Sequence, residues 1–562
     1  MSRVAPGRAA RLAGWALAAA TAILVVANQH SVGIARDEAV YLQAGARYAD
    51  WWIGLVSFRH GISQASVTAA FGGPGATDNN REHPPVMKTL SGLSARLVHG
   101  GLGVDEVTAA RLPSAILHGA LVLWVYGMAL ELWGAAAAVI AALLLALLPR
   151  ALFHAGLACF DAPSMALWFA TVRAYWRGLD RRWPWQAGVA WGLALGTKHT
   201  ALLLPFALGA HYLVLGAIAW RGVAPELRGA SRAARLRGLL RTVIGHRWRV
   251  IASLAVLGPV TLYLVWPWLW FDPVHHVRDW LAFHLGHVHY NYEYLGHNWN
   301  APPFPWHVAL VTTLFTVPAA TLAAAVVGAA VWIAGRTRPA RAPALLLALS
   351  AAASIGPFLL GTTPIFGAEK HWMPALPTIC IAAGVGAAWA GRAAAGAIQR
   401  ATARRVPEPV AIAAVAGCLV LAAAVETRIA EPYALTWYSA LAGGAPGGAD
   451  LGMNRQFWGV AIRGELPRLA AEARPDGPTY VYTHDASPAW GIYQREGLVP
   501  RTLLDAGWEQ AGIDRSDLAV VIHERHFNRH DYLIWKAYGT VRPIDVLTSD
   551  GVPIVSLYRR PR

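Results

Sequence analysis

Two adjacent carboxylates, Asp37 and Glu38, follow the first apolar segment of the chain, which ends near Val26. Helix-forming residues and the aromatic Tyr41 come directly after them. Acidic side chains at the end of an apolar segment lie at a boundary between lipid and water, where a carboxylate can remove a proton from a bound hydroxyl. The pair could instead cap a helix on the membrane surface, because acids stabilise the first turn of a helix.

The composition predicts a polytopic α-helical membrane protein. Hydrophobic residues make up 56% of the 562 residues and charged residues only 14%, with a mean hydropathy of +0.37, which excludes a water-soluble protein of this length. The segment 84–99 is more polar than the apolar runs, and we expect it to form a helix on the outer surface. From run length and loop charge we expect about eleven transmembrane helices, near residues 11–28, 107–131, 134–150, 155–176, 184–198, 200–219, 250–270, 306–334, 342–361, 372–390 and 408–425.

The positive charge indicates the orientation of these helices. The net charge of +16 comes from arginines grouped in the loops between the apolar segments, not on one binding face, which argues against nucleic acid as a partner. Loops rich in Lys and Arg belong to the cytoplasm. An odd number of crossings then places the amino terminus in the cytoplasm and the tail outside. The composition, rich in Ala and Arg, is compatible with a bacterium of high genomic GC content, and we expect a multi-pass protein of the cytoplasmic (inner) membrane.

The chain divides into two parts by composition. Residues 1–425 contain the apolar segments and a long first outer loop, 29–106. Residues 426–562 have ordinary charge density and short β-like runs at 479–482 and 518–522, which predict a small extracytoplasmic α/β domain. The three cysteines lie in or beside apolar segments, so we expect no disulfide framework.

Apart from the arginines of the cytoplasmic loops, the ionisable residues that a bilayer penalises nearly all fall on the predicted outer side. Carboxylates and cations together at that surface suit the transfer of a group from a lipid-borne phosphate to an acceptor hydroxyl, since the carboxylate deprotonates the hydroxyl and the cations stabilise the departing phosphate. The cations on this side that could stabilise the donor phosphate include Arg150, Lys370 and His371, and Lys88 lies at the far end of the first outer loop. The candidates for positioning the substrate or a cation include Glu82, His83 and Tyr294, and the acidic Asp161 lies on the same side.

Several short motifs resemble the GT-C glycosyltransferases, which include the protein O-mannosyltransferases and the aminoarabinose transferases that modify lipid A. The resemblance covers roughly residues 10–390 and rests on the order and placement of the motifs. These motifs are Arg36 to Tyr41, Glu82-His83-Pro84-Pro85 with Lys88, Ala110-Arg111-Leu112-Pro113-Ser114, Phe160-Asp161-Ala162-Pro163, Gly192 to Lys198, Tyr294-Leu295-Gly296 with Pro302-Pro303 and Pro305-Trp306, and Lys370 to Pro377.

The resemblance implies a GT-C fold and an inverting glycosyltransferase that uses a polyprenyl-phosphate sugar. Asp37 would be the general base, with Glu38 assisting, Lys88 would contact the donor phosphate, and Asp161 would position the substrate or a cation. The sugar could be a hexose or a pentose, and the acceptor a protein, a lipid or a glycan, because the tail carries no motif of the family. No cofactor is required by these motifs, and the question of a divalent cation stays open.

Each assignment has a structural alternative. Asp161 could pair with Arg150, because buried charges find partners, and Lys88 and Lys198 could extend along the membrane surface to water. Trp508, like Trp490 and Tyr493, could contact an acceptor or belong to the core of the tail.

Histidines cluster in the loop that follows the segment 250–270, where His284, His287 and His289 could together bind a metal ion. The same loop is rich in Tyr and Trp, which gather at membrane interfaces and could also shape a sugar pocket. The competing function is a transporter or flippase of a lipid-linked or anionic substrate. Transporters often show inverted repeats with charges at the midplane, whereas this chain shows no repeat and places its charges at one face.

Overall fold

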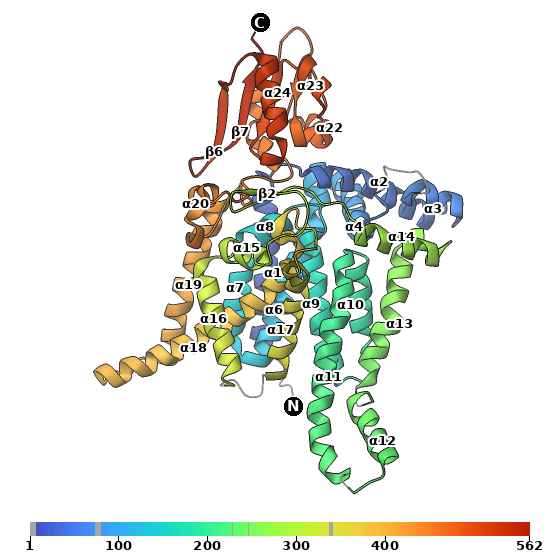
Figure 1. Cartoon of the computed structure of the whole chain (residues 1–562), viewed down its shortest axis with the longest axis vertical. Coiled ribbons are helices and arrows are strands. Elements are labelled where there is room, and N and C mark those ends of the chain that lie inside the picture. Colours follow the sequence, from blue (N-terminus) through green and yellow to red (C-terminus); the bar gives the residue numbers. More distant parts are fainter. Residues whose placement is uncertain (1–6, 73–79, 228, 246, 336–340, 562) are drawn as a thin grey trace.

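The computed structural model describes residues 7–72, 80–227, 229–245, 247–335 and 341–561. Its helices form an elongated bundle, and a small sheet with its own helices lies beyond one end of that bundle (Figure 1). Short surface helices, among them α2 (Arg36–Val56), α3 (Gln64–Phe71) and α14 (Pro273–Leu285), lie across the same end. The protein therefore has a layer of surface elements between the bundle and the sheet.

Seven helices of the described part are long and apolar enough to cross a membrane. Two further pairs of helices qualify only when each pair is taken as one bent span: α7 (Ala135–Ala146) with α8 (Pro149–Ala155), and α15 (Val308–Thr316) with α16 (Ala319–Ile333). The pairs bend by 66° and 118°, at Pro149 and Pro318, because proline cannot donate the backbone hydrogen bond that continues a helix. The seven are α1 (Arg8–Gln29), α6 (Glu106–Trp133), His199–Leu227, α13 (Trp248–Val265), Arg341–Leu359, Met373–Thr402 and α19 (Glu408–Ala430).

The multi-pass helical architecture predicted from composition is confirmed, but the count of eleven crossings is not. Each of the predicted segments overlaps a helix, yet two of these helices do not qualify as spans. One is α9 (Asp161–Gly178), which carries three charged residues, and the other is α10 (Trp185–Leu195), with 11 residues. A helix of that length covers only about 17 Å of a hydrocarbon core of ~30 Å.

The first outer loop is largely helical. The segment expected as a surface helix forms α4 (Val86–Ser94) and a following turn of π-helix, Ala95–His99. Helix α4 packs tightly against α2, because a Cβ atom added at Gly92 would lie 2.0 Å from the backbone oxygen of Gly45. Glycine at both positions lets the two backbones touch and fixes α2 over the bundle.

The tail of the chain contains a five-stranded mixed sheet with the order β4-β3-β5-β7-β6. The two runs expected as strands form β3 (Thr479–Tyr482) and β5 (Leu518–Ile522), which pair in parallel. Every residue of β5 is buried, as in a central strand covered on both faces. The remaining strands are β4 (Leu503–Asp505), β6 (Asp545–Ser549) and β7 (Val552–Arg559), and the helices beside them are α22 (Trp490–Arg495), α23 (Gln510–Arg515) and α24 (Asn528–Tyr538).

This sheet domain is joined to the bundle by an apolar core. Ile34, just before α2, is buried with Trp490 and Tyr493 of α22. The Tyr493 hydroxyl also accepts a hydrogen bond from the backbone N–H of Ile34, at 2.7 Å. Trp490 and Tyr493 are therefore core residues, as the structural alternative predicted, and they hold the domain over the start of α2.

Candidate functional site

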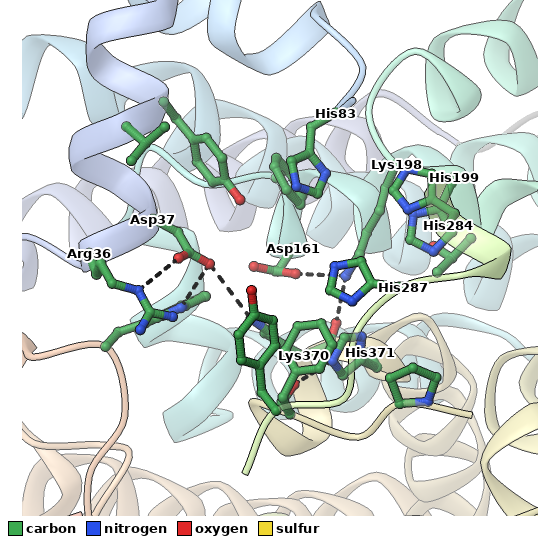
Figure 2. Close-up of a pocket in the computed structure, with 18 of the residues that line it drawn as sticks. Arg36, Asp37, His83, Asp161, Lys198, His199, His284, His287, Lys370 and His371 are labelled. Atoms are coloured by element: carbon green, nitrogen blue, oxygen red, sulfur yellow. Dashed lines mark hydrogen bonds and ion pairs between the residues drawn. The ribbon is translucent and has the colours of Figure 1, made fainter. Parts of the chain in front are cut away.

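A cavity of about 810 Å³ lies between the bundle and the sheet domain. Its charged lining comes from elements that are far apart in the sequence and includes Arg36, Asp37, Asp161, Lys198 and Lys370. Figure 2 shows Asp37, Asp161, Lys198 and Lys370 directed toward one another across it. The tail contributes Trp458, Tyr482, His484, Asp485, Pro488, Trp508 and Phe527 to the same lining.

Asp37 lies in the first turn of α2 and keeps 27% of its side chain exposed. Its Oδ2 atom accepts a hydrogen bond from the indole N–H of Trp458 at 2.9 Å. The Nζ atom of Lys370 is 3.9 Å from the same oxygen, and the Arg36 Nε is 3.4 Å from Oδ1. The carboxylate is thus surrounded by donors, yet it remains accessible from the cavity.

Lys370 belongs to a short 3-10 helix, Ala368–His371, and its ammonium group is buried among aromatic rings. The Nζ atom lies 4.2 Å from the ring centre of Trp458 and 4.6 Å from that of Phe457, where the ring faces stabilise a cation. Burial lowers the pKa of Lys370 from its ordinary value, and the nearby Asp37 carboxylate opposes that shift. A negative group that entered the cavity would stabilise the charged form.

Asp161 and Lys198 form a buried ion pair in the cavity wall. The Lys198 Nζ is 2.7 Å from the Asp161 Oδ1 and also donates to the backbone carbonyl of Lys370 at 3.2 Å. The structural alternative in which Asp161 pairs with Arg150 is therefore wrong in its partner, and so is the extension of Lys198 to the membrane surface. Asp161 lies at the first position of α9, where a carboxylate also suits the helix dipole.

Arg150 does not line this cavity. Its Nη1 is 2.8 Å from Glu369 Oε2, and its Nη2 donates to the carbonyls of Leu435 and Trp437, each at 3.0 Å. Nitrogens on both arms of its guanidinium group therefore have protein partners. The structure favours a structural role for Arg150, which joins α8 to the chain beyond α19, over the predicted contact with a donor phosphate.

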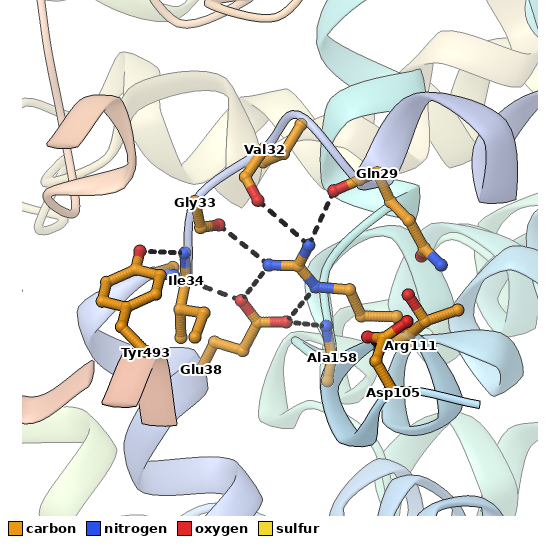
Figure 3. Close-up of polar contacts among 11 residues, drawn as sticks. Gln29, Val32, Gly33, Ile34, Glu38, Asp105, Arg111, Ala158 and Tyr493 are labelled. Carbon is orange, nitrogen blue, oxygen red and sulfur yellow. Dashed lines mark hydrogen bonds and ion pairs between the residues drawn. The ribbon is translucent and has the colours of Figure 1, made fainter. Parts of the chain in front are cut away.

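Glu38 does not line the cavity, although it is adjacent to Asp37, and Figure 3 shows it in contact with Arg111 and Ala158. The side chain is fully buried, and Arg111 of α6 donates to both of its oxygens, from Nε at 2.8 Å and from Nη2 at 2.7 Å. The backbone N–H groups of Ala158 and Ala35 donate to the same two oxygens, at 2.6 and 3.2 Å. The structure therefore does not bring Glu38 to Asp37 as a catalytic partner, because all of these contacts are with buried protein groups and none is with the cavity.

Lys88 is also withdrawn from the cavity. Its ammonium group is buried and donates to the backbone carbonyl and side-chain oxygen of Asn80 and to the carbonyl of His83. Burial lowers the pKa of Lys88 to about 7, with the Glu82 carboxylate opposing the shift. The extension of Lys88 to water is therefore wrong. Because the group already has three acceptors, it supports the loop before α4 and does not face a donor phosphate.

The remaining candidates divide between the cavity and the core. His83 lines the cavity beside Phe160, and His371 lines it with a ring nitrogen bonded to the carbonyl of Phe366. Glu82 does not line it, and its carboxylate accepts from the Asn80 side chain at 2.9 Å. Tyr294 is buried at the end of β1 (Tyr292–Tyr294), with its hydroxyl 2.6 Å from His307 Nδ1, so it does not line the cavity either.

The histidine loop does not form the three-histidine metal site. His284 stacks on His199 with ring centres 3.7 Å apart, and His287 stacks on Phe366 instead of turning toward His284 and His289. In the described ranges of the chain, no group of three or more His, Cys, Asp or Glu side chains is arranged to hold a metal ion.

Three residues of the site were not singled out by the sequence. Arg36 bridges Asp37 and Asp485, with its Nη1 2.9 Å from Asp485 Oδ1, and Trp458 donates to Asp37. Arg36 could have been suspected from its place beside the two acids. Trp458 and Asp485 lie in the tail, where no motif marks them, and Trp458 is 421 residues from its partner.

Comparison with known proteins supports part of the resemblance. Residues 82–229 match the family model of dolichyl-phosphate-mannose-protein mannosyltransferases. The resemblance to GT-C glycosyltransferases of the protein O-mannosyltransferase type is therefore confirmed for this segment, which includes Asp161 and Lys198 but not Asp37 or Lys370. No curated protein matches the sequence.

Solved structures align with nearly the whole chain at low identity. ArnT from Cupriavidus metallidurans in the apo state is 16% identical, with 97% of this chain and 98% of that chain covered and a TM-score of 0.49. The same protein bound to undecaprenyl phosphate is 15% identical, with 96% of this chain and 97% of that chain covered and a TM-score of 0.47. The oligosaccharyltransferase AglB from Archaeoglobus fulgidus, in complex with an inhibitory peptide and a dolichol-phosphate, is 13% identical, with 94% and 71% covered and a TM-score of 0.46.

Proposed function

We propose that the protein is an inverting glycosyltransferase that moves a sugar from a polyprenyl-phosphate donor to an acceptor hydroxyl in the cavity described above. The observation that carries the proposal is the environment of Asp37. It is a partly exposed carboxylate that faces buried lysines in a cavity at one end of a helical bundle. A general base and a cationic site for a leaving phosphate are the two parts that this reaction needs.

The chemistry follows from these positions. Asp37 accepts the proton of the acceptor hydroxyl while the hydroxyl oxygen attacks the anomeric carbon from the face opposite the phosphate. The bond between that carbon and the phosphate oxygen breaks, and its electron pair leaves with the phosphate. The phosphate thereby gains one negative charge, which Lys370 and, behind it, Lys198 stabilise in a site of low dielectric.

The carboxylates favour inversion over retention. A retaining enzyme uses a second carboxylate as a nucleophile, about 5 Å from the first. The other carboxylates that line the cavity in the described part of the chain, Asp161 and Asp485, are buried and paired with Lys198 and Arg36. Asp37 therefore acts as a single base, and direct displacement inverts the anomeric centre.

The apolar part of the lining suits a lipid-linked donor. Leucines from the turn before α11 (Leu204–Val223) and from α14 form one side of the cavity: Leu202, Leu203, Leu281 and Leu285. An isoprenoid chain that lies against these residues would bring its phosphate toward Lys198 and Lys370. The transferred group is a hexose or a pentose.

The proposed setting is the outer face of a bacterial cytoplasmic membrane. The amino terminus is then cytoplasmic, residues 1–425 form the membrane part, and residues 426–562 form the extracytoplasmic domain over the cavity. The positive charge of the alternate loops supports this orientation. A lipid-linked donor is needed there, because nucleotide sugars are made in the cytoplasm. The transporter alternative gives no role to the base and the phosphate-binding cations.

The test compares two Asp→Asn substitutions on the same helix. The purified full-length protein in nanodiscs is given radiolabelled polyprenyl-phosphate sugars and a membrane extract as acceptor, and release of the sugar from lipid is measured. Asp37→Asn should lower turnover by about 10²–10⁴-fold, the usual contribution of a general base. Asp50→Asn is the control, because Asp50 also lies on α2 but pairs with Arg96 at 2.7 Å outside the cavity.

Near-normal release by Asp37→Asn would remove Asp37 from the mechanism. If neither the wild-type protein nor the Asp50→Asn control released sugar from any donor, glycosyl transfer would be refuted and the transporter alternative favoured.

A further inference from the structure

Building on the proposed function, we infer that the sheet domain forms an acceptor subsite and that this subsite binds carbohydrate, so that the acceptor hydroxyl belongs to a sugar. Two parts of the chain contribute to the cavity lining. Leucines of the turn before α11 and of α14 are one part, and the tail is the other, through Tyr482, His484, Asp485, Trp508 and Phe527. Since the leucines suit the donor lipid, the acceptor contacts the domain side of the cavity.

Trp508 provides an aromatic surface on the domain side of the cavity. Its side chain is 61% exposed although it lines the cavity, and the loop that carries it is firmly held. Asp505, at the end of β4, accepts from the Thr483 hydroxyl at 2.7 Å and from the backbone N–H of Gly507 at 3.1 Å. The Tyr482 hydroxyl donates to the backbone carbonyl of Trp508 at 3.0 Å. A large exposed ring on a fixed loop is a preorganised contact surface, which binds a ligand with little loss of conformational entropy.

A second aromatic group faces the same space. The rings of Phe527 and His484 meet edge to face with centres 3.8 Å apart, and both residues line the cavity. His484 has a φ of 58°, in the left-handed region that non-glycine residues seldom adopt. Such a backbone conformation persists only where the surrounding structure maintains it, and here it keeps the imidazole in the cavity wall.

Polar groups for hydroxyl binding lie beside these rings. Asp485 accepts from Arg36 Nη1 at 2.9 Å, and the same guanidinium contacts Asp37 through Nε at 3.4 Å. One arginine thus connects the domain side of the cavity to the proposed base. A sugar ring has apolar C–H faces and hydroxyl edges, so it fits a site with flat aromatic rings beside a carboxylate and a guanidinium group.

The topology argues against an extended peptide as the acceptor. Peptides that bind as an added strand pair with the free edge of a sheet. The edge strands are β4 and β6, and none of their residues lines the cavity. The domain instead offers a turn, the 3-10 helix His484–Ala489 and the 3-10 helix Arg525–Phe527. The reaction then joins two sugars: a hydroxyl oxygen of the acceptor sugar bonds to the anomeric carbon, its proton passes to Asp37, and the phosphate leaves with the bonding electrons.

The first experiment identifies the new linkage. The wild-type protein in nanodiscs transfers label from its polyprenyl-phosphate donor to the components of a membrane extract, and the labelled product is divided. One part undergoes partial acid hydrolysis and the other mild alkaline β-elimination. A labelled disaccharide after partial hydrolysis is expected. A labelled monosaccharide that alkali releases from a protease-sensitive product would show transfer to Ser or Thr and overturn the inference, while leaving the proposed function intact.

The second experiment tests the subsite itself. Trp508→Ala should raise the KM for the acceptor about tenfold, the loss expected for one aromatic contact, and leave the KM for the donor unchanged. Tyr532→Ala is the matched control, because Tyr532 is also 61% exposed but lies on α24 outside the cavity. Trp508→Phe should recover most of the acceptor affinity. Equal effects of Trp508→Ala and Tyr532→Ala, or a rise in the donor KM, would refute the subsite.

Discussion

Glu38→Gln should destabilise the protein, whereas the same change at Asp37 should not. The reason is the distribution of donors around Glu38 (Figure 3). Its Oε1 accepts from Arg111 Nε at 2.8 Å and from the Ala158 N–H at 2.6 Å, and its Oε2 accepts from Arg111 Nη2 at 2.7 Å and from the Ala35 N–H at 3.2 Å. A glutamine has one acceptor oxygen and one NH2 group. In either orientation its NH2 would face a guanidinium N–H and a backbone N–H.

The magnitude follows from burial. Glu38 is fully buried and Arg111 nearly so, and the guanidinium group has no other carboxylate within ion-pair distance among the described residues. Its remaining acceptors are the neutral carbonyls of Gln29, Val32 and Gly33. Removing one partner of a buried ion pair typically costs about 3–5 kcal/mol, because an uncompensated charge remains. We expect a loss of this size in the free energy of unfolding, with turnover of the surviving folded fraction largely retained.

The assay measures stability and activity separately. Thermal unfolding in detergent is followed by size-exclusion chromatography, and turnover is normalised to the folded protein. Asp37→Asn should unfold at the wild-type temperature with little turnover, and Glu38→Gln should unfold well below it. Asp50→Asn, on the same helix and exposed, should resemble the wild type in both measurements. A Glu38→Gln protein with normal unfolding and lost turnover would refute this reasoning and restore Glu38 to the mechanism.

Two further outcomes are expected. Trp458→Phe keeps a ring near Lys370 but loses the N–H that binds Asp37. Because a hydrogen bond to a charged group is lost, kcat should fall about tenfold or more at unchanged KM. Trp306→Phe, outside the cavity, is the control, and an unchanged kcat for Trp458→Phe would contradict this expectation. Burial raises the pKa of Asp531 to about 7, so the folded state holds a proton that the unfolded state releases near pH 4. The resulting stabilisation is present at low pH and is lost as the pH rises through 7, so the unfolding temperature should be higher at pH 5.5 than at pH 8. Asp531→Asn should reduce that difference, and an undiminished difference would exclude Asp531 as a source.

The sequence predicted the features that depend on local pattern. Apolar runs of sufficient length gave the helical membrane part, because a hydrocarbon core selects for them wherever they occur. The count of eleven is not confirmed at α9, which carries three charged residues, and at α10, a helix of 11 residues, and the segments at Pro149 and Pro318 qualify only as bent spans. Hydropathy averages over such breaks, whereas the structure resolves them.

The sequence predicted the type of site but not all of the residues that form it. Charged residues near apolar segments are costly to bury, so the sequence marks them as functional candidates. Four residues selected in this way line the cavity: Asp37, Asp161, Lys370 and His371. Glu38 was grouped with Asp37 by adjacency. Successive residues of a helix point about 100° apart, so neighbours in sequence can face different surroundings. Glu38 is held apart from Asp37 by Arg111, which lies 73 residues from Glu38 in the sequence, and no local pattern reveals this pairing.

Four of the acid–cation contacts in and near the cavity can be compared. In three of them the atoms are 2.7 or 2.8 Å apart and both side chains are buried, which fixes one element to another and leaves no carboxylate free. In the fourth, the distance is 3.9 Å and the carboxylate is partly exposed. The three close pairs are Glu38–Arg111, Asp161–Lys198 and Glu369–Arg150, and the open one is Asp37–Lys370.

This difference supports Asp37, among these acids, as the proposed base. A carboxylate held by a guanidinium and backbone N–H groups would have to break those contacts before it could accept a proton. Asp37 has the indole N–H of Trp458 on one oxygen and the longer contacts to Lys370 and Arg36, so a hydroxyl can reach it without displacing a close ion pair. The three closed pairs hold α2, α9 and the Lys370 segment in place. The partly exposed carboxylate beside them would suit the proposed general base, which must be positioned before the substrate binds.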